Sequence, residues 1–193
     1  MIEATSDRRS ERAWFDGWNA TRVAFRLVGW AALLIAVGAG RAAWAWEEPL
    51  PEPTGPVILE VIGEIGKTND GQSARLDRTL LAELPAHDLR TTTSVTDGVN
   101  VFDGFLMRDL LERLGATGDT VIASALNDYV IEIPMSDFER FDVLVATHMD
   151  GSELLARDKG PLWIVYPRDD HDELQDIRYD YRWVWQLMTL EVR

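Results

Sequence analysis

The chain has 193 residues, no cysteine and a formal net charge of −14, with 33 acidic against 19 basic side chains. Hydrophobic residues make up 46% of it, which is enough for one globular domain with a buried core. The missing cysteine excludes disulfides, thiolate nucleophiles and cysteine-held metal sites. The acidic balance excludes nucleic acid as a partner, because binding to a phosphate backbone requires a cationic surface.

The first 45 residues have the order of a secretory signal peptide. Arg22 and Arg26 precede an uncharged run at 27–40 (LVGWAALLIAVGAG), and the sequence Ala43-Trp44-Ala45 follows it. A basic flank, an apolar run and a small-x-small site form an export signal. The run is shorter than the roughly 20 residues that cross a bilayer. We therefore expect residues 1–45 to be a cleaved signal peptide and the protein to be periplasmic, with a retained membrane anchor as the alternative.

The rest of the chain divides into a linker and a folded domain. The leader contains six arginines and four acidic residues, so its removal leaves 148 residues with a net charge of −16. Residues 46–56 (WEEPLPEPTGP) contain four prolines and three glutamates, a composition that stays extended and solvated. We expect residues 46–56 to be a linker and residues 57–193 to be the domain.

Short strands dominate the expected domain. Runs of β-branched residues predict strands, and clusters of Gly, Asn and Asp predict the turns between them. The expected strands lie at 57–62, 88–96, 99–102, 120–126, 129–133, 143–147, 162–166 and 186–192.

Few and short helices are expected between the strands. Asp77 is placed to cap a short leucine-rich helix, and Gly115 to end a second helix at 105–114. Ser136 is expected to cap a single helical turn, and the acidic segment 168–180 to be a solvated loop. Many short strands, few short helices and no regular strand–helix alternation indicate an α+β fold that is mostly β.

No catalytic or metal-binding motif emerges from the spacing of reactive residues. Gly66-Lys67-Thr68 lacks the leading glycine of a phosphate loop. The three histidines have no metal-ligand spacing, and the acidic run 169–173 lacks the pattern of a calcium loop. No serine lies in a GxSxG setting. We therefore predict no catalytic residue and no metal ligand.

Polar residues next to aromatic residues recur at the predicted strand ends. Such a combination suits a flat heteroaromatic ligand, which needs a face to stack on and hydrogen bonds along its edge. Each residue taken singly also has a structural explanation as a turn, core or loop residue. The candidate binding residues are Thr93, Ser94, Thr96, Asn127, Asp128, Tyr129, Arg157, Asp158, Lys159 and Trp183.

In their order along the chain, these segments resemble the oxidoreductase molybdopterin-binding domain, the cofactor fold of sulfite oxidase and its relatives. The similarity extends over about residues 57–192. The matching positions are Phe102-Asp103-Gly104-Phe105 with Leu110-Leu111 and Gly115, Asn127-Asp128-Tyr129 with Ile133-Pro134, Gly151 with Gly160-Pro161-Leu162 and Pro167, and Trp183-Val184-Trp185-Gln186-Leu187.

One departure from that family decides what the resemblance implies. Its catalytic members carry a cysteine that binds molybdenum, and Ser94 in Thr93-Ser94-Val95-Thr96 takes that place to within one residue. A serine hydroxyl is a poor substitute for a soft thiolate. The chain looks closest to a short, cysteine-free, exported branch of the fold. For that branch the resemblance implies a periplasmic pterin-binding protein without molybdenum, which reports pterin levels to a membrane enzyme of cyclic di-GMP metabolism.

A pterin has a ring that can stack and a guanidine-like edge that a carboxylate can bind through two hydrogen bonds. We expect Asp128 or Asp158 at that edge and Tyr129 or Trp183 against the ring, with the other candidates on the remaining groups. Two alternatives stay open. The chain could be a molybdopterin-dependent oxidoreductase, or a subunit of one, in which serine or water replaces the thiolate. It could also be an adaptor without a ligand, whose acidic surface binds a basic partner.

Overall fold

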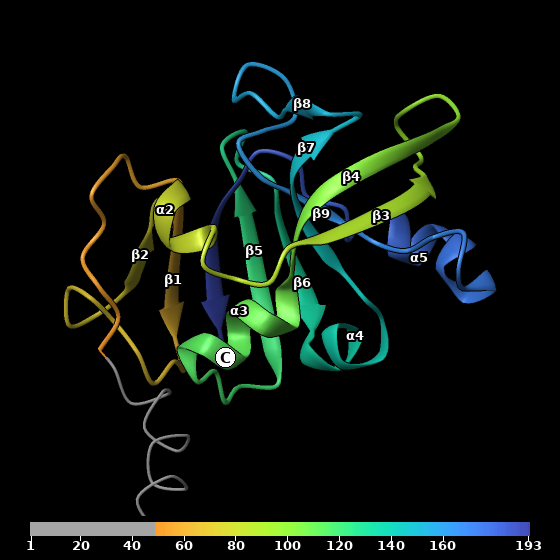
Figure 1. Cartoon of the computed structure of the whole chain (residues 1–193). Coiled ribbons are helices and arrows are strands. Elements are labelled where there is room, and N and C mark those ends of the chain that lie inside the picture. Colours follow the sequence, from red (N-terminus) through yellow and green to blue (C-terminus); the bar gives the residue numbers. More distant parts are fainter. Residues whose placement is uncertain (1–48) are drawn as a thin grey trace, which may run out of the picture. The chain divides into compact units, whose positions relative to one another are not determined.

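The computed structural model describes residues 49–193, so the predicted signal peptide and the start of the predicted linker lie outside the described residues. Within residues 49–193 there are ten strands, four short α-helices and one 3-10 helix. None of these helices is long and apolar enough to span a membrane. The predicted α+β fold, mostly β, is confirmed (Figure 1).

The first sheet has five strands in the order β2-β1-β10-β5-β6 (Figure 1). Strand β10, the last of the chain, lies between β1 and β5 and runs parallel to β1; the other pairs are antiparallel. The C-terminal strand is therefore central to this sheet. The strands are β1 (Leu59–Gly63), β2 (Ala74–Leu76), β5 (Thr120–Ala125), β6 (Val130–Pro134) and β10 (Leu187–Val192).

The second sheet is antiparallel throughout and is built around β7. Its strand order is β3-β4-β7-β8, and β9 also pairs with β7. Phe102 and Trp163 meet edge to face in its core, with ring centroids 5.3 Å apart. The strands are β3 (His87–Thr92), β4 (Val99–Leu106), β7 (Leu144–Met149), β8 (Ser152–Glu153) and β9 (Trp163–Val165).

The short helices have the predicted caps at two of three places. The Asp77 carboxylate accepts the backbone N–H of Leu80 at 2.9 Å, and this hydrogen bond, opposed by desolvation, lowers the pKa of Asp77. Gly115 ends its helix in the left-handed conformation at φ 63°. Ser136 is not a cap, because the helix begins after Pro134 without a side-chain cap. The helices are α2 (Arg78–Leu81), α3 (Met107–Leu114), α4 (Met135–Arg140), α5 (Ile177–Asp180) and the 3-10 helix η1 (Asp172–Gln175).

Two predicted boundaries around β4 were wrong. The strand expected at 88–96 ends at Thr92, because the Thr93 hydroxyl accepts the backbone N–H of Thr96 at 2.9 Å and folds the chain into a turn. The helix expected from residue 105 begins at Met107, since Phe105 and Leu106 continue β4 in register with β7. Tertiary pairing overrides the leucine periodicity there.

Two segments expected to be solvated are packed instead. In the predicted linker, Leu50 is 6% exposed, and the backbone N–H of Gly55 donates to the Asp77 carboxylate at 2.7 Å. The acidic segment 168–180 contains η1 and α5, and its Leu174 is fully buried. Strand β8 was not predicted, and it is too short for a periodic signal.

Candidate ligand-binding site

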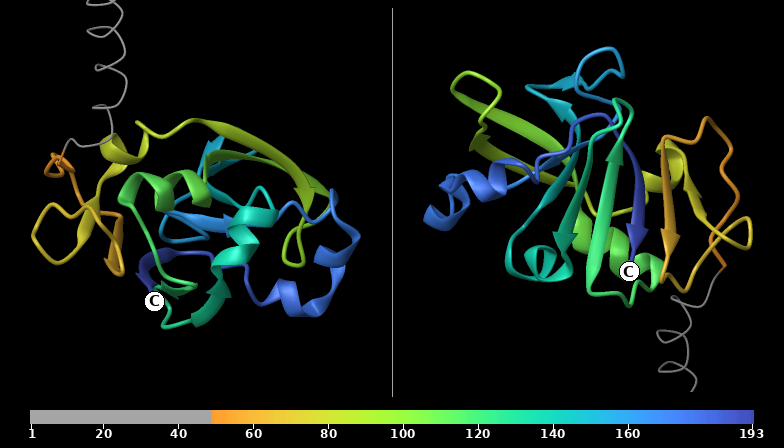
Figure 2. Two further views of the ribbon diagram at one scale, coloured as in Figure 1. Left: turned by 90° about the horizontal axis from the view of Figure 1, so that it is seen from below. Right: turned by 180° about the vertical axis from the view of Figure 1, so that it is seen from behind.

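A cavity of about 320 Å³, here called the aromatic pocket, lies where three separate segments meet. They are the loop after β3, the turn between β5 and β6, and the stretch from α5 to β10; the end of β3 and α5 lie side by side in every view (Figures 1 and 2). Its volume is within the usual range for small-ligand sites, about 300–1,000 Å³. The lining residues are Ser94, Val95, Asn127, Tyr129, Ile177, Asp180, Tyr181, Trp183 and Trp185.

Threonine hydroxyls shape the loop after β3. The Thr93 hydroxyl accepts the backbone N–H groups of Val95 at 3.1 Å and Thr96 at 2.9 Å. The Thr96 hydroxyl donates to the Asn100 side chain at 2.6 Å, and Asn100 donates in turn to Asp150 at 3.0 Å. This chain of hydrogen bonds sets the loop conformation that presents Ser94 to the pocket.

The turn between β5 and β6 brings Tyr129 to the pocket. Asp128 occupies a left-handed position at φ 65°, which short polar side chains tolerate. The Tyr129 phenol donates to the backbone carbonyl of Tyr181 at 2.7 Å and so ties the turn to the segment before β10. Burial raises the pKa of Tyr129, so the phenol remains a neutral donor at neutral pH.

The segment before β10 is anchored in the core by Trp183. The Trp183 side chain is 4% exposed and packs edge to face on Trp163, with ring centroids 6.3 Å apart. Its Nε1–H has no hydrogen-bond acceptor within residues 49–193. A buried donor without an acceptor is costly, so a ligand acceptor within reach would stabilise it.

An ion pair between Arg182 and the buried Asp137 also holds the segment before β10 in place. Arg182 donates to the Asp137 carboxylate, which is 3% exposed and also accepts the Tyr166 hydroxyl at 2.9 Å. The Arg182 guanidinium also lies over the Tyr179 ring, 4.7 Å from its centroid. Burial, together with the neighbouring Asp137 carboxylate, raises the pKa of Tyr166. These contacts fix the backbone on either side of Arg182, where Tyr181 and Trp183 line the pocket.

Asp180 is the carboxylate of the aromatic pocket. Its Oδ1 is buried without a hydrogen-bond donor among residues 49–193, and the nearest cation is Arg168, whose Nε lies 3.6 Å away. Asp180, paired with Arg168, and Trp183, whose indole N–H lacks an acceptor, therefore line one cavity with aromatic walls. This combination fits a flat heterocycle with a hydrogen-bonding edge, such as a pterin.

The structure brings four of the ten predicted site residues together: Ser94, Asn127, Tyr129 and Trp183 all line the aromatic pocket. Thr93 and Thr96 support its loop without lining it.

The two carboxylates predicted at the pterin edge lie elsewhere. Asp128 is a turn residue outside the lining, and Asp158 is a solvent-exposed residue 3.4 Å from Lys159. Lys159 itself lies over the Trp163 ring, 5.9 Å from its centroid, and Arg157 belongs to the same loop outside the pocket. Among the lining residues of the aromatic pocket, the carboxylate is that of Asp180.

Sequence reasoning missed Ile177 and Asp180 because the acidic segment was interpreted as a solvated loop. A signal for the helix was present: Asp176 is an N-cap whose carboxylate accepts the backbone N–H of Arg178 at 2.9 Å. The other missed lining residues are Val95, Tyr181 and Trp185.

The pocket does not offer the donor set that molybdenum has in the catalytic relatives. The chain contains no cysteine, and Ser94 is the lining residue nearest in sequence to the expected thiolate position. No group of three or more acidic or histidine side chains that could hold a metal ion occurs within residues 49–193.

Comparisons with known proteins give a family match for part of the chain and a similar fold. Residues 82–169 match the model of the oxidoreductase molybdopterin binding domain, a span that includes Ser94 and Tyr129 but ends before Asp180. No curated protein matches the sequence.

Among solved structures, the chain is similar to the sulfane dehydrogenase SoxCD from Paracoccus pantotrophus, with a TM-score of 0.52 and 16% identity. The match covers 69% of this chain and 37% of that one, so this chain spans little more than a third of the SoxCD chain. At this identity the likeness concerns the fold. The resemblance expected from the sequence is confirmed: residues 82–169 match the oxidoreductase molybdopterin binding domain, on a fold of the sulfite oxidase type.

Proposed function

We propose that this protein is a pterin-binding protein whose aromatic pocket holds the pterin ring without molybdenum. One observation carries the proposal: the Asp180 carboxylate and the aromatic residues Tyr129 and Trp183 line one cavity. The Asp180 carboxylate would accept two hydrogen bonds from the guanidine-like edge of the pterin. Tyr129 and Trp183 would contact its faces, and the indole N–H would donate to an acceptor on the ring.

The physiological role in this proposal is that of a periplasmic pterin sensor. The protein is exported by its N-terminal segment and reports pterin levels to the periplasmic part of a membrane enzyme of cyclic di-GMP metabolism. The support is the leader-like order of residues 1–45 and the lack of cysteine on a fold whose enzymes use a thiolate. A protein that only binds a pterin requires the pocket but does not require a thiolate that holds a metal.

Titration calorimetry of the full chain with reduced and oxidised pterins tests the binding step. We expect saturable binding with a stoichiometry of one and quenching of tryptophan fluorescence, because the ring lies against Trp183. Absence of binding at high micromolar pterin would overturn the proposal.

Because residues 82–169 match an oxidoreductase cofactor domain, a second candidate function is that of a molybdopterin-dependent oxidoreductase or a subunit of one. Elemental analysis of protein purified from its native host separates the two. We expect no stoichiometric molybdenum, and molybdenum at one equivalent would favour the enzyme.

A further inference from the structure

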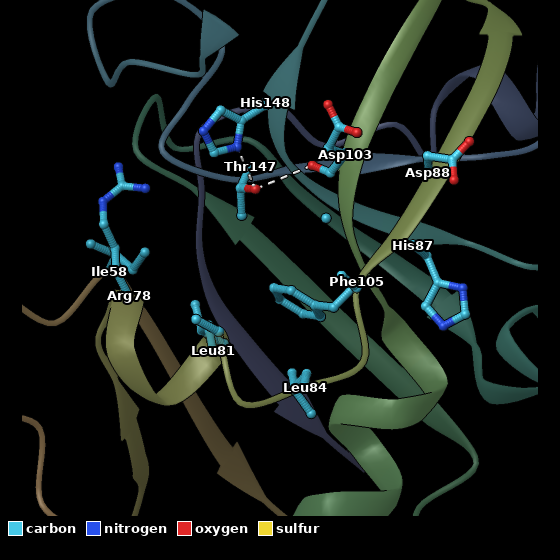
Figure 3. A pocket seen from close by; sticks show the side chains of 13 residues that line it. Ile58, Arg78, Leu81, Leu84, His87, Asp88, Asp103, Phe105, Thr147 and His148 are labelled. Atoms are coloured by element: carbon cyan, nitrogen blue, oxygen red, sulfur yellow. Dashed lines mark hydrogen bonds between the residues drawn. The ribbon is translucent and has the colours of Figure 1, made fainter. Parts of the chain in front are cut away.

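A second cavity, of about 490 Å³, lies away from the aromatic pocket and shares no lining residue with it. Its base is apolar: Leu81, Leu84 and Phe105 are each less than 9% exposed, and their side chains gather at the foot of the cavity in Figure 3. The cavity lies between α2 and the strands β3, β4 and β7. We call it the α2 pocket.

A row of polar side chains crosses the sheet beside this base. Asp88 on β3 pairs in register with Asp103 on β4, and Asp103 pairs with His148 on β7. Residues directly opposite each other on neighbouring strands point to the same face of a sheet. Because Asp103 and Phe105 are two apart on β4, they also share that face. The two carboxylates therefore lie beside the apolar base.

The cationic and histidine side chains around the α2 pocket already have partners. Arg78 on α2 forms an ion pair with Glu153 at 2.5 Å, and His87 Nε2 lies 3.5 Å from the Asp109 carboxylate. His148 Nδ1 shares a hydrogen bond of 2.9 Å with the Thr147 hydroxyl, as Figure 3 shows. None of these groups bonds the side chain of Asp88 or Asp103; the Thr147 hydroxyl donates to the backbone carbonyl of Asp103 at 3.2 Å.

The Asp88 and Asp103 carboxylates make no hydrogen bond or ion pair within residues 49–193. Like charges directly opposite each other on neighbouring strands destabilise a sheet, and the net charge of −14 adds to the negative potential. A bound cation would relieve this repulsion. Because the carboxylates lie beside an apolar base, the cation that fits is an organic one with an apolar part.

From this arrangement we propose that the α2 pocket binds a small organic cation with an apolar body. The apolar part lies against Leu81, Leu84 and Phe105, and the ammonium or amidinium group lies between Asp88 and Asp103. This site is independent of the pterin site, because the two cavities have no residue in common.

The test uses 2-phenylethylammonium as the probe and NMR chemical-shift titration of the full chain as the measurement. We expect saturable shifts at the amides of Asp103, Phe105 and His148. The neutral analogue 2-phenylethanol and the anionic analogue phenylacetate carry the same ring, and we expect each to bind about threefold to fivefold more weakly, since one partly exposed charge pair contributes up to about fivefold. Raising the ionic strength weakens binding of the cation alone.

Two substitutions connect the binding to the carboxylates. Asp88→Asn and Asp103→Asn each weaken binding of the cation about threefold to fivefold while keeping side-chain shape. The matched control, Asp97→Asn, removes one exposed charge in the loop before β4 and leaves the affinity unchanged. Lack of saturable shifts at 10 mM probe would overturn the proposal. So would equal binding of the alcohol or the carboxylate analogue, or unchanged affinity in Asp103→Asn.

Discussion

Two walls of the aromatic pocket are held in place by different forces. The core wall, residues 180–185, is tied to the interior because Trp183 packs on Trp163 and Arg182 binds the buried Asp137. The loop wall, residues 93–98, is held by side-chain hydrogen bonds near the surface, centred on Thr93. Packing and a buried ion pair cost more to disturb than a surface hydrogen bond. In the proposed pterin complex, we therefore expect the core wall to fix the position of the ring and the loop wall to adapt to its substituents.

The largest expected effect comes from removing the anchor of the core wall. Asp137→Ala leaves Arg182 without its partner and the Tyr166 hydroxyl without its acceptor, so we expect a loss of about 3 kcal/mol in the free energy of unfolding. This is the lower end for a buried pair, because the Arg182 side chain is 23% exposed. Urea unfolding measures it. Asp142→Ala breaks an exposed pair with Arg108 and serves as the control, with a change below about 0.5 kcal/mol. Equal losses in both variants would contradict the distinction between the walls.

A smaller effect is expected from altering the inner surface of the core wall. Trp183→Phe keeps an aromatic ring against Trp163 but removes the indole N–H, so we expect pterin affinity to fall about tenfold. Fluorescence or calorimetric titration measures this change. In the control, Met188→Leu, the substituted side chain is exposed on β10 outside the pocket, and the affinity is expected to stay unchanged. If both variants bind equally well, the indole N–H has no role in binding.

The loop wall is expected to respond more weakly. Thr93→Val preserves the shape of the side chain but removes the acceptor for the N–H groups of Val95 and Thr96. We expect about 1 kcal/mol of lost stability, or about 2–4 °C in Tm, with pterin affinity lowered less than in Trp183→Phe. Thr117→Val, at an exposed position outside the pocket, is the control for thermal unfolding. A larger loss of affinity than in Trp183→Phe would reverse the ranking of the two walls.

Acid is expected to loosen the loop wall through Asp150. The backbone N–H of Val101, followed by the Asn100 side chain, holds the pKa of the Asp150 carboxyl below its usual value. Since the folded-state pKa is the lower one, this carboxylate stabilises the fold above the unfolded pKa of about 3.9. The contribution is lost as the pH falls through the folded-state value.

Hydrogen exchange of the Val101 amide between pH 5 and pH 2 measures this loosening. We expect its protection to decrease with acid in the wild type. Asp150→Asn keeps an acceptor and tolerates the left-handed backbone at φ 51°, so it should remove the acid dependence. Identical acid profiles in the two proteins would exclude Asp150 as the titrating group.

The same two walls show how far the sequence predicts the site. Threonines before Asp97-Gly98 and the polar turn Asn127-Asp128-Tyr129 indicate strand ends directly, so Ser94, Asn127 and Tyr129 were predicted. Trp183 was predicted because it lies among aromatic residues next to Arg182 at a predicted strand end.

The sequence did not predict Asp180 as a pocket residue, because its position depends on contacts between residues that are far apart in the sequence. Leu174 is buried under α5, and Arg182 is held by Asp137 on α4, 45 residues earlier. Charge density in 168–180 suggested solvent exposure, whereas these tertiary contacts fold the segment against the domain. The boundary between β4 and α3 failed for the same reason, since pairing with β7 decides it.

The most direct measurement of the central claim is a calorimetric comparison of Asp180→Asn with Asp158→Asn. Both substitutions remove one carboxylate charge, but only Asp180 lines the aromatic pocket. A charge-assisted bidentate contact is among the stronger hydrogen-bonding arrangements, so we expect Asp180→Asn to lose at least about tenfold in pterin affinity and Asp158→Asn to bind like the wild type. Wild-type affinity in Asp180→Asn, or an equal loss in Asp158→Asn, would contradict the assignment of the aromatic pocket as the pterin site.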